Sequence, residues 1–257
     1  MNWKTFFAML QRDGHVARRN LLPMLLQNLL QPLLLTFVFG RVLTASGLMR
    51  GDYKNILLPG VMAISMVLSG IQAVAMPLIA ELQFTKEIED RLLAPMENHW
   101  VAVEKIIAGM IQALVSGLVT IPAAWLLIGS GVHVDVSNIG IFAVICLLVA
   151  LMSSSGGLAL GCSVGQTQIG LMFSLIVAPM MMFGCAYYPW QSLGAVSKVL
   201  QYAVLINPLV YASEGLRGAL VSSVQSIPSM AVVGALIVMD VAFLALGLTK
   251  FRQKTLS

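Results

Sequence analysis

Charged side chains are scarce in this chain, and their scarcity excludes most soluble folds. Only 10% of the 257 residues are Asp, Glu, Lys or Arg, whereas 58% are hydrophobic. Soluble domains carry about 25% charged residues, which supply the surface that faces water. The sequence therefore predicts an integral membrane protein. The net charge of +4 does not indicate nucleic-acid binding, because the basic residues lie at the ends of apolar segments.

Residues that carry catalysis or bind metals are also few. The cysteines, Cys146, Cys162 and Cys185, lie in apolar segments without metal-ligand spacing, so we interpret them as small buried hydrophobic residues. No histidine lies in an apolar segment long enough to span a membrane, so the serines at 153–155 have no base for a serine-protease mechanism. We expect no catalytic residue, metal site or cofactor on this chain.

A phosphate-binding loop is absent as well. The pattern G-x-x-x-x-G-K-[ST], whose backbone amides hold nucleotide phosphates, occurs nowhere in the sequence. If this chain takes part in an ATP-driven process, another polypeptide must bind ATP and Mg²⁺.

Six apolar stretches reach or approach the roughly 20 residues that a helix needs to span a membrane. They cover 21–40, 56–80, 106–128, 139–161, 169–185 and 230–249. We predict an all-α integral membrane protein with six transmembrane helices in a single domain, 1–257. Residues 2–20 place aromatic side chains on one helical face and basic ones on the other, which predicts an amphipathic helix at the lipid interface.

Basic residues predict the orientation of these spans. Ten of the fifteen Lys and Arg residues lie at the two termini and in the loop 81–105. The chain crosses the membrane an even number of times between these three regions, so they lie on the same side. The positive-inside rule therefore predicts that both termini and this loop are cytoplasmic. The segment 186–228 then lies on the outer face.

The outer segment 186–228 does not have the composition of a simple loop. It is mostly apolar, yet it contains Pro189, Pro208 and the charged pair Glu214 and Arg217. A solvated loop would be more polar, and a spanning helix would not carry these prolines. We interpret the segment as re-entrant, with two short helices that enter the outer face of the membrane and return.

The start of the second re-entrant helix has a clear signal. Asn207 can cap free backbone amides, and Pro208 suits the first helical position. The pattern N-P-L-x-Y-x-x-E-x-x-R begins here, after an aromatic–proline turn and a short amphipathic stretch. Its residues are Phe183, Tyr187 or Tyr188, Pro189, Asn207, Pro208, Leu209, Tyr211, Glu214 and Arg217.

This order and spacing resembles the C-terminal signature of type-2 ATP-binding-cassette export permeases, and the resemblance extends over nearly the whole chain. It implies a membrane-spanning subunit in a bacterial inner membrane. It also implies two partners: a second copy of the permease, and ATPase subunits that hold ATP and Mg²⁺. The outer gate would comprise Tyr187, Tyr188, Pro189, Asn207, Pro208, Tyr211, Glu214 and Arg217.

The loop 81–105 is the main cytoplasmic feature. Two oppositely charged pairs spaced four residues apart support a short helix, and two leucines give it an apolar patch. Such a helix suits docking into a groove on a partner, although a solvated connector has the same composition. The resemblance implies that it couples to the ATPase subunit. The docking residues would be Glu87, Asp90, Arg91, Leu92 and Leu93.

Two features allow more than one interpretation. Gly109, Ala113 and Gly117 permit close helix packing, within the subunit or against a second one, and we favour the former. Asp240 is the only acidic residue well inside a predicted span. It is either a functional carboxylate or a structural one, with a partner on the first or fourth span.

Glu214 and Arg217 also have two interpretations. They share a helix face, and they either form a wet surface pair worth less than about 1 kcal/mol or hold the outer helices closed as a gate. In the gate interpretation each charge has a partner, either the other member of the pair or a residue of the second permease.

The predicted function is that of a permease subunit in an ATP-driven exporter. Aromatic residues make up only 7% of the chain and the central spans are aliphatic and rich in methionine, which favours a drug-like or lipid-like amphiphile as substrate. The alternative is a polysaccharide or lipo-oligosaccharide. A remote alternative is an intramembrane enzyme, which would need paired catalytic groups in the spans.

Overall fold

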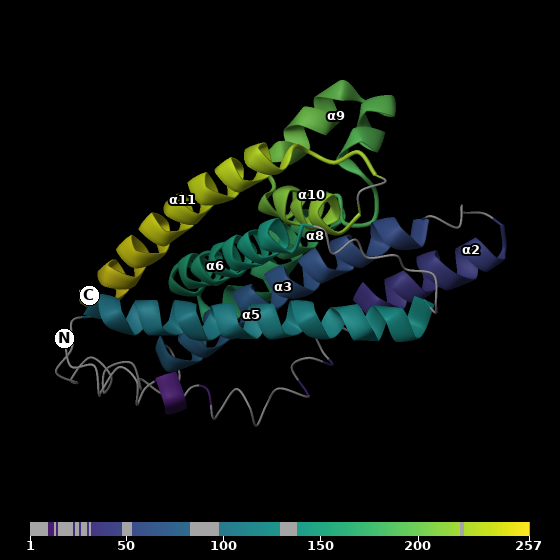
Figure 1. Ribbon diagram of the computed structural model, residues 1–257. Helices are drawn as coiled ribbons and strands as arrows, with labels where there is room; N and C mark the ends of the chain where they lie inside the picture. The colour runs from purple at the N-terminus through teal and green to yellow at the C-terminus, as the bar shows by residue number, and fades with distance from the viewer. Residues whose placement is uncertain are drawn as a thin grey trace.

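The computed structural model describes residues 10–12, 14, 23, 26, 30, 32–47, 53–82, 98–128, 138–221 and 224–256. Within these ranges every regular element is a helix, in agreement with the predicted class (Figure 1). The long helices are α3 (Tyr53–Ala80), α5 (Asn98–Ile128), α6 (Ile139–Ser163) and α11 (Ser229–Leu256). The shorter elements are η1 (Val38–Val42), α2 (Leu43–Ala45), η3 (Gln166–Gln168), α7 (Ile169–Met172), η4 (Phe173–Val177), α8 (Ala178–Met182), η5 (Trp190–Ala195), α9 (Lys198–Ala203), η6 (Val204–Ile206) and α10 (Pro208–Leu220).

Four of the predicted spans are helices that are long and apolar enough to cross a membrane. They lie in α3, α5, α6 and α11, and each has at least 25 residues, whereas about 20 residues suffice for a hydrocarbon core of about 30 Å. All four helices extend past the predicted ends, α3 and α6 by only two or three residues. The helix α5 begins at Asn98 rather than at residue 106, and α11 ends at Leu256 rather than at residue 249.

Within the described residues, the first predicted span overlaps the apolar helix Pro32–Ala45, and the fifth corresponds to the apolar helix Ile169–Met182. Most of 21–31 and of the interfacial segment 2–20 lies outside the described residues. The fifth helix contains the π-helical turn η4 and extends for about 21 Å at 1.5 Å per residue. It is therefore too short to cross a bilayer core of about 30 Å by itself.

The helix α3 lies at the centre of the bundle and packs against α5, α6 and α10 (Figure 1). Between Lys54 and Glu81 it carries no charged residue, so it can be covered by neighbours on every side. The helix α11 crosses α6 on the outside of the bundle, and its Phe251 packs against Val101 and Ala102 near the start of α5.

Small residues let these helices approach closely. In α5, a methyl group on Gly109 would meet Val74 of α3, and one on Gly117 would meet Met66. Ala113, between them, is fully buried. The small-residue row therefore packs within the subunit, which confirms the simpler of its two predicted roles.

At Gly157 the helix α6 lies directly against the backbone of α3, because an added Cβ would lie 2.8 Å from the backbone oxygen of Ile71. We expect Gly157→Leu to lower the free energy of unfolding by about 1–3 kcal/mol, because the two backbones must separate to admit the side chain. Thermal unfolding in detergent measures the loss. The matched control is Gly140→Leu on the same helix, where no atom lies within 4 Å of an added Cβ. Equal unfolding temperatures for the two variants would contradict this account of the packing.

Candidate functional site

The helix α10 begins as its sequence predicts. The Asn207 side chain accepts a hydrogen bond from the Leu209 amide at 3.0 Å, and Pro208 occupies the first helical position. The other end of the Asn207 amide donates to the Met180 carbonyl at 2.7 Å. The cap therefore also ties α10 to the end of α8, a contact that the capping pattern does not predict.

Glu214 and Arg217 form an ion pair with each other on α10, and both side chains are 0% exposed. The interpretation of these residues as a wet surface pair is therefore wrong. Each is the partner that the other requires, because a single buried charge would carry a large desolvation penalty.

The pair also binds backbone groups from three other places in the outer segment. Glu214 accepts hydrogen bonds from the amides of Trp190 at 2.9 Å and Ile227 at 3.3 Å. Arg217 Nη2 donates to the carbonyls of Cys185 at 2.8 Å and Ala186 at 3.2 Å. The ion pair thus connects the turn after α8, the start of η5 and the segment before α11 to one helix.

The turn after α8 has an unusual backbone. Cys185 has a φ of 52°, in the left-handed region that residues other than glycine rarely adopt. Its carbonyl is held by Arg217, and the preceding Gly184 carbonyl accepts a 2.6 Å bond from the Ser213 hydroxyl. Two residues of α10 therefore fix this turn. Ser213 was not among the predicted site residues, because a serine within a helix gives no signal of a distant partner.

The tyrosines of the predicted gate have different environments. The Tyr187 carbonyl accepts a hydrogen bond from the hydroxyl of Tyr53, at the start of α3, and the Tyr187 ring lies 6.0 Å from that of Phe39. Burial raises the pKa of Tyr187 to about 12, so this side chain stays neutral. The Tyr188 hydroxyl donates to the Met182 carbonyl at 2.9 Å, and Tyr211 packs against the main core.

Pro189 directly precedes η5 with an extended backbone, and it brings the Trp190 amide to Glu214. The structure therefore places all eight predicted gate residues in the outer segment, around α10 and the turn before η5. Trp190 itself is an addition to the set, since its indole also donates to the Gln201 carbonyl at 2.8 Å.

The predicted docking residues of the cytoplasmic loop, Glu87, Asp90, Arg91, Leu92 and Leu93, lie outside the described residues. The two ends of the loop are described, and they are joined by an ion pair of 2.7 Å between Lys105 and Glu81. Both side chains are largely buried. The sequence analysis did not predict this pair, because its only signal in the sequence is two opposite charges next to long apolar segments.

Asp240 lies on α11 and is 3% exposed. Neither carboxylate oxygen has a hydrogen-bond partner among the described residues. The serine hydroxyls at 153–155, on the fourth span, were candidate partners for Asp240. They donate hydrogen bonds to carbonyls of their own helix instead. Within the described residues, no group of three or more His, Cys, Asp or Glu could hold a metal ion.

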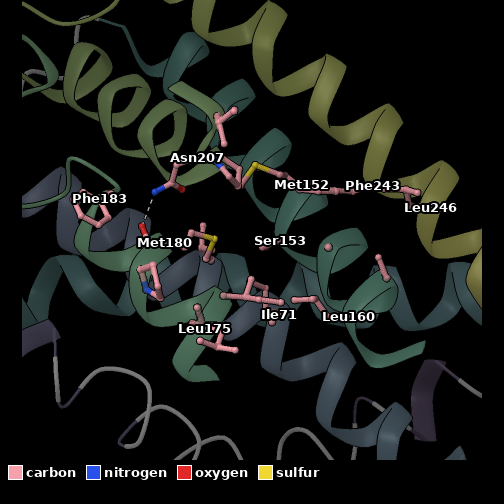
Figure 2. A pocket seen from close by; sticks show the side chains of 18 of the residues that line it. Ile71, Met152, Ser153, Leu160, Leu175, Met180, Phe183, Asn207, Phe243 and Leu246 are labelled. Carbon is pink, nitrogen blue, oxygen red and sulfur yellow. Dashed lines mark hydrogen bonds between the residues drawn. The ribbon is translucent and has the colours of Figure 1, made fainter. Parts of the chain in front are cut away.

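A groove of about 680 Å³ lies next to the outer segment (Figure 2). Its lining residues come from α3, α6, η4, α8, the stretch from α9 to the start of α10, and α11. Its lining is mostly aliphatic; among the described residues it includes two methionines, Met152 and Met180, and two aromatic residues, Phe183 and Phe243. Asn207 and Met180, joined by their hydrogen bond, form part of the wall at the outer end.

These features define a multi-pass membrane protein, and comparison with known proteins gives its family. Residues 4–221 match the ABC-2 type transporter family, so the chain belongs to that family. It is 25% identical over 209 residues to the inner membrane transport permease YadH of Escherichia coli K12, which covers 80% of this chain and 78% of YadH. The YadH proteins of Escherichia coli O157:H7 and Shigella flexneri match equally well. Because this is a family of transport permeases, the alternative function of an intramembrane enzyme is excluded.

The burial of the ion pair predicts a large effect of breaking it. We expect Arg217→Met and Glu214→Gln each to lower the free energy of unfolding by about 3–5 kcal/mol, because each change leaves the other charge buried without its ionic partner. Arg217→Met also removes the donor to the carbonyls of Cys185 and Ala186. Denaturant unfolding of the purified protein measures the loss. Lys198→Met, at an exposed position of α9 in the same segment, is the control and should change stability little.

The charge-swapped double variant, Glu214→Arg with Arg217→Glu, tests the backbone contacts. We expect it to remain unstable, because the amides of Trp190 and Ile227 would face a cation and two carbonyls would face a carboxylate. A swapped variant as stable as the wild type would show that only the charge pair itself matters.

Proposed function

We propose that this chain forms the substrate path of an ATP-driven exporter. Two copies would pair in the membrane, and ATPase subunits would dock beneath them on the loop 81–105. The family supports a transporter subunit with an ATPase partner. The direction of transport, the pairing of two copies and the substrate are the parts that we propose.

The observation that carries this proposal is the continuity of α3 between the two ends of the molecule. At one end α3 leads into Glu81, which is paired with Lys105 across the loop. At the other end the Tyr53 hydroxyl bonds to the Tyr187 carbonyl, and Gly60 packs directly against the backbone of Ala186. A helix of 28 residues spans about 42 Å, so a displacement at the loop would reach the outer turn through one continuous helix.

The outer segment would then act as the exit gate. When ATP binding draws the ATPase subunits together, they push on the loops 81–105. The movement passes along α3 to the turn at 185–187, which Arg217 joins to α10. Because the ion pair also holds η5 and the start of α11 through their amides, the outer helices would move together and not one at a time.

The chemistry of the described surfaces favours an amphiphile as substrate. Sugar-binding paths use aromatic rings that stack on the sugar, yet the groove contains only two aromatic side chains. Its aliphatic and methionine lining adapts to varied apolar shapes. Polysaccharide or lipo-oligosaccharide export remains the second candidate within the same family.

The division of labour between subunits gives one test. We expect the purified chain to hydrolyse no ATP, and hydrolysis to appear when the ATPase subunit is added. Glu87→Arg should reduce the amount of ATPase that co-purifies, at a direct folding cost of only about 0.2–0.5 kcal/mol. Glu89→Arg, in the same loop but outside both charged pairs, is the control. ATP turnover by the isolated chain, or equal co-purification of both variants, would contradict the proposal.

The role of α3 gives a second test. We expect Tyr53→Phe to lower the amount of substrate exported per ATP, because the link from α3 to the outer turn loses a hydrogen bond worth about 0.5–1.5 kcal/mol. Co-purification of the ATPase should not change, since the loop is untouched. Tyr202→Phe is the control: it removes a tyrosine hydroxyl at an exposed position of α9, in the outer segment, and should export normally. Normal export by Tyr53→Phe would remove α3 from the proposed route.

A further inference from the structure

The polar groups of the groove are nearly all used within the protein. Ser153 donates to the Ala150 carbonyl at 3.0 Å, and Ser163 donates to the Ala159 carbonyl at 2.7 Å. Asn207 is held between α8 and α10. The wall therefore offers little to a polar molecule, and it favours an apolar chain along most of its length.

Lys250 is the exception. It is the only charged residue among the described residues of the lining, and it is exposed one turn beyond Leu246 on α11. Among the described residues it forms no ion pair. An apolar groove with a single cation at one end matches a molecule that has an apolar chain and one anionic end.

The groove also has the depth of one leaflet. On α6 the lining extends from Met152 to Ser163, about 16 Å at 1.5 Å per residue. Half of a hydrocarbon core is about 15 Å. The lining also includes Ile206 and Pro208 of the outer segment, and the exposed rims at Leu175 and Leu246 leave the groove open sideways.

We propose that this groove binds an anionic phospholipid from the cytoplasmic leaflet, with an acyl chain between α6, α8 and α11 and the phosphate at Lys250. Lys250 follows the last apolar turns of α11, on the side where the basic residues predict the cytoplasm. Basic sites between transmembrane helices on that side suit acidic lipid head groups. The inference does not rest on export, because it concerns the permease chain alone.

Native mass spectrometry of the full-length chain tests the site without the ATPase subunit. The protein is equilibrated with equal amounts of phosphatidylglycerol and phosphatidylcholine that carry the same acyl chains. We expect the wild type to retain phosphatidylglycerol in preference, and Lys250→Gln to reduce that preference about fivefold. Arg252→Gln is the matched control: it removes a charge from the same turn of α11 at a residue outside the lining, and it should keep the preference.

A second variant tests the apolar part of the site. Gly156 lines the groove, and an added Cβ would make only ordinary contact with the Phe243 ring at 3.6 Å. Gly156→Leu should therefore fold and fill the groove, and it should lower retention of both lipids. Added inorganic phosphate should not displace the lipid, since most of the contact is with its chain.

Three results would overturn the proposal. One is equal retention of the two lipids by the wild type, and another is the same loss in Arg252→Gln as in Lys250→Gln, which would indicate a general surface charge. The third is efficient disulfide cross-linking between two copies through Leu246→Cys at the rim, which would show that a second permease covers the groove. Each result leaves the predictions for ATP hydrolysis and export unchanged.

Discussion

The buried ion pair of Glu214 and Arg217 is the constraint on which the outer part of this protein depends. Removing two charges from water is costly, and the cost is recovered only when good geometry and further hydrogen bonds accompany the pair. Here the further bonds come from the backbone at Cys185, Ala186, Trp190 and Ile227. The strained turn, the start of η5 and the approach to α11 must therefore all stay in place for the charges to remain buried.

The same network explains why a short fifth helix can end inside the bundle. The chain leaves α8 at Met182, after too few residues to cross a bilayer core. The following turn is buried and not helical, so its backbone groups need partners. Ser213, Arg217 and Asn207 provide them for the carbonyls of Gly184, Cys185, Ala186 and Met180. Irregular backbone at this depth is therefore compatible with a membrane, because protein groups replace the missing water.

The helix α3 joins this network to the two ends of the loop 81–105, and its burial follows from its sequence. A helix without charges over 26 residues can be surrounded by other helices, and its small residues admit α6 and the outer turn at short range. The groove lies to one side of this centre. It exists because α11 packs on α6 while α8 ends at Met182. No side chain of the described residues fills the space between these three helices.

The sequence by itself determined the all-helical membrane class, four of the spans, the start of α10 at Asn207-Pro208 and the family to which the chain belongs. These depend on composition, on apolar length and on local hydrogen bonds, all of which are set by neighbours along the chain. Only the tertiary structure decided that Glu214 and Arg217 are buried, that Glu81 pairs with Lys105, and that Asp240 has no hydrogen-bond partner among the described residues. The cost of a charge depends on what surrounds it in space, and residues more than 20 positions away in the sequence supply those surroundings.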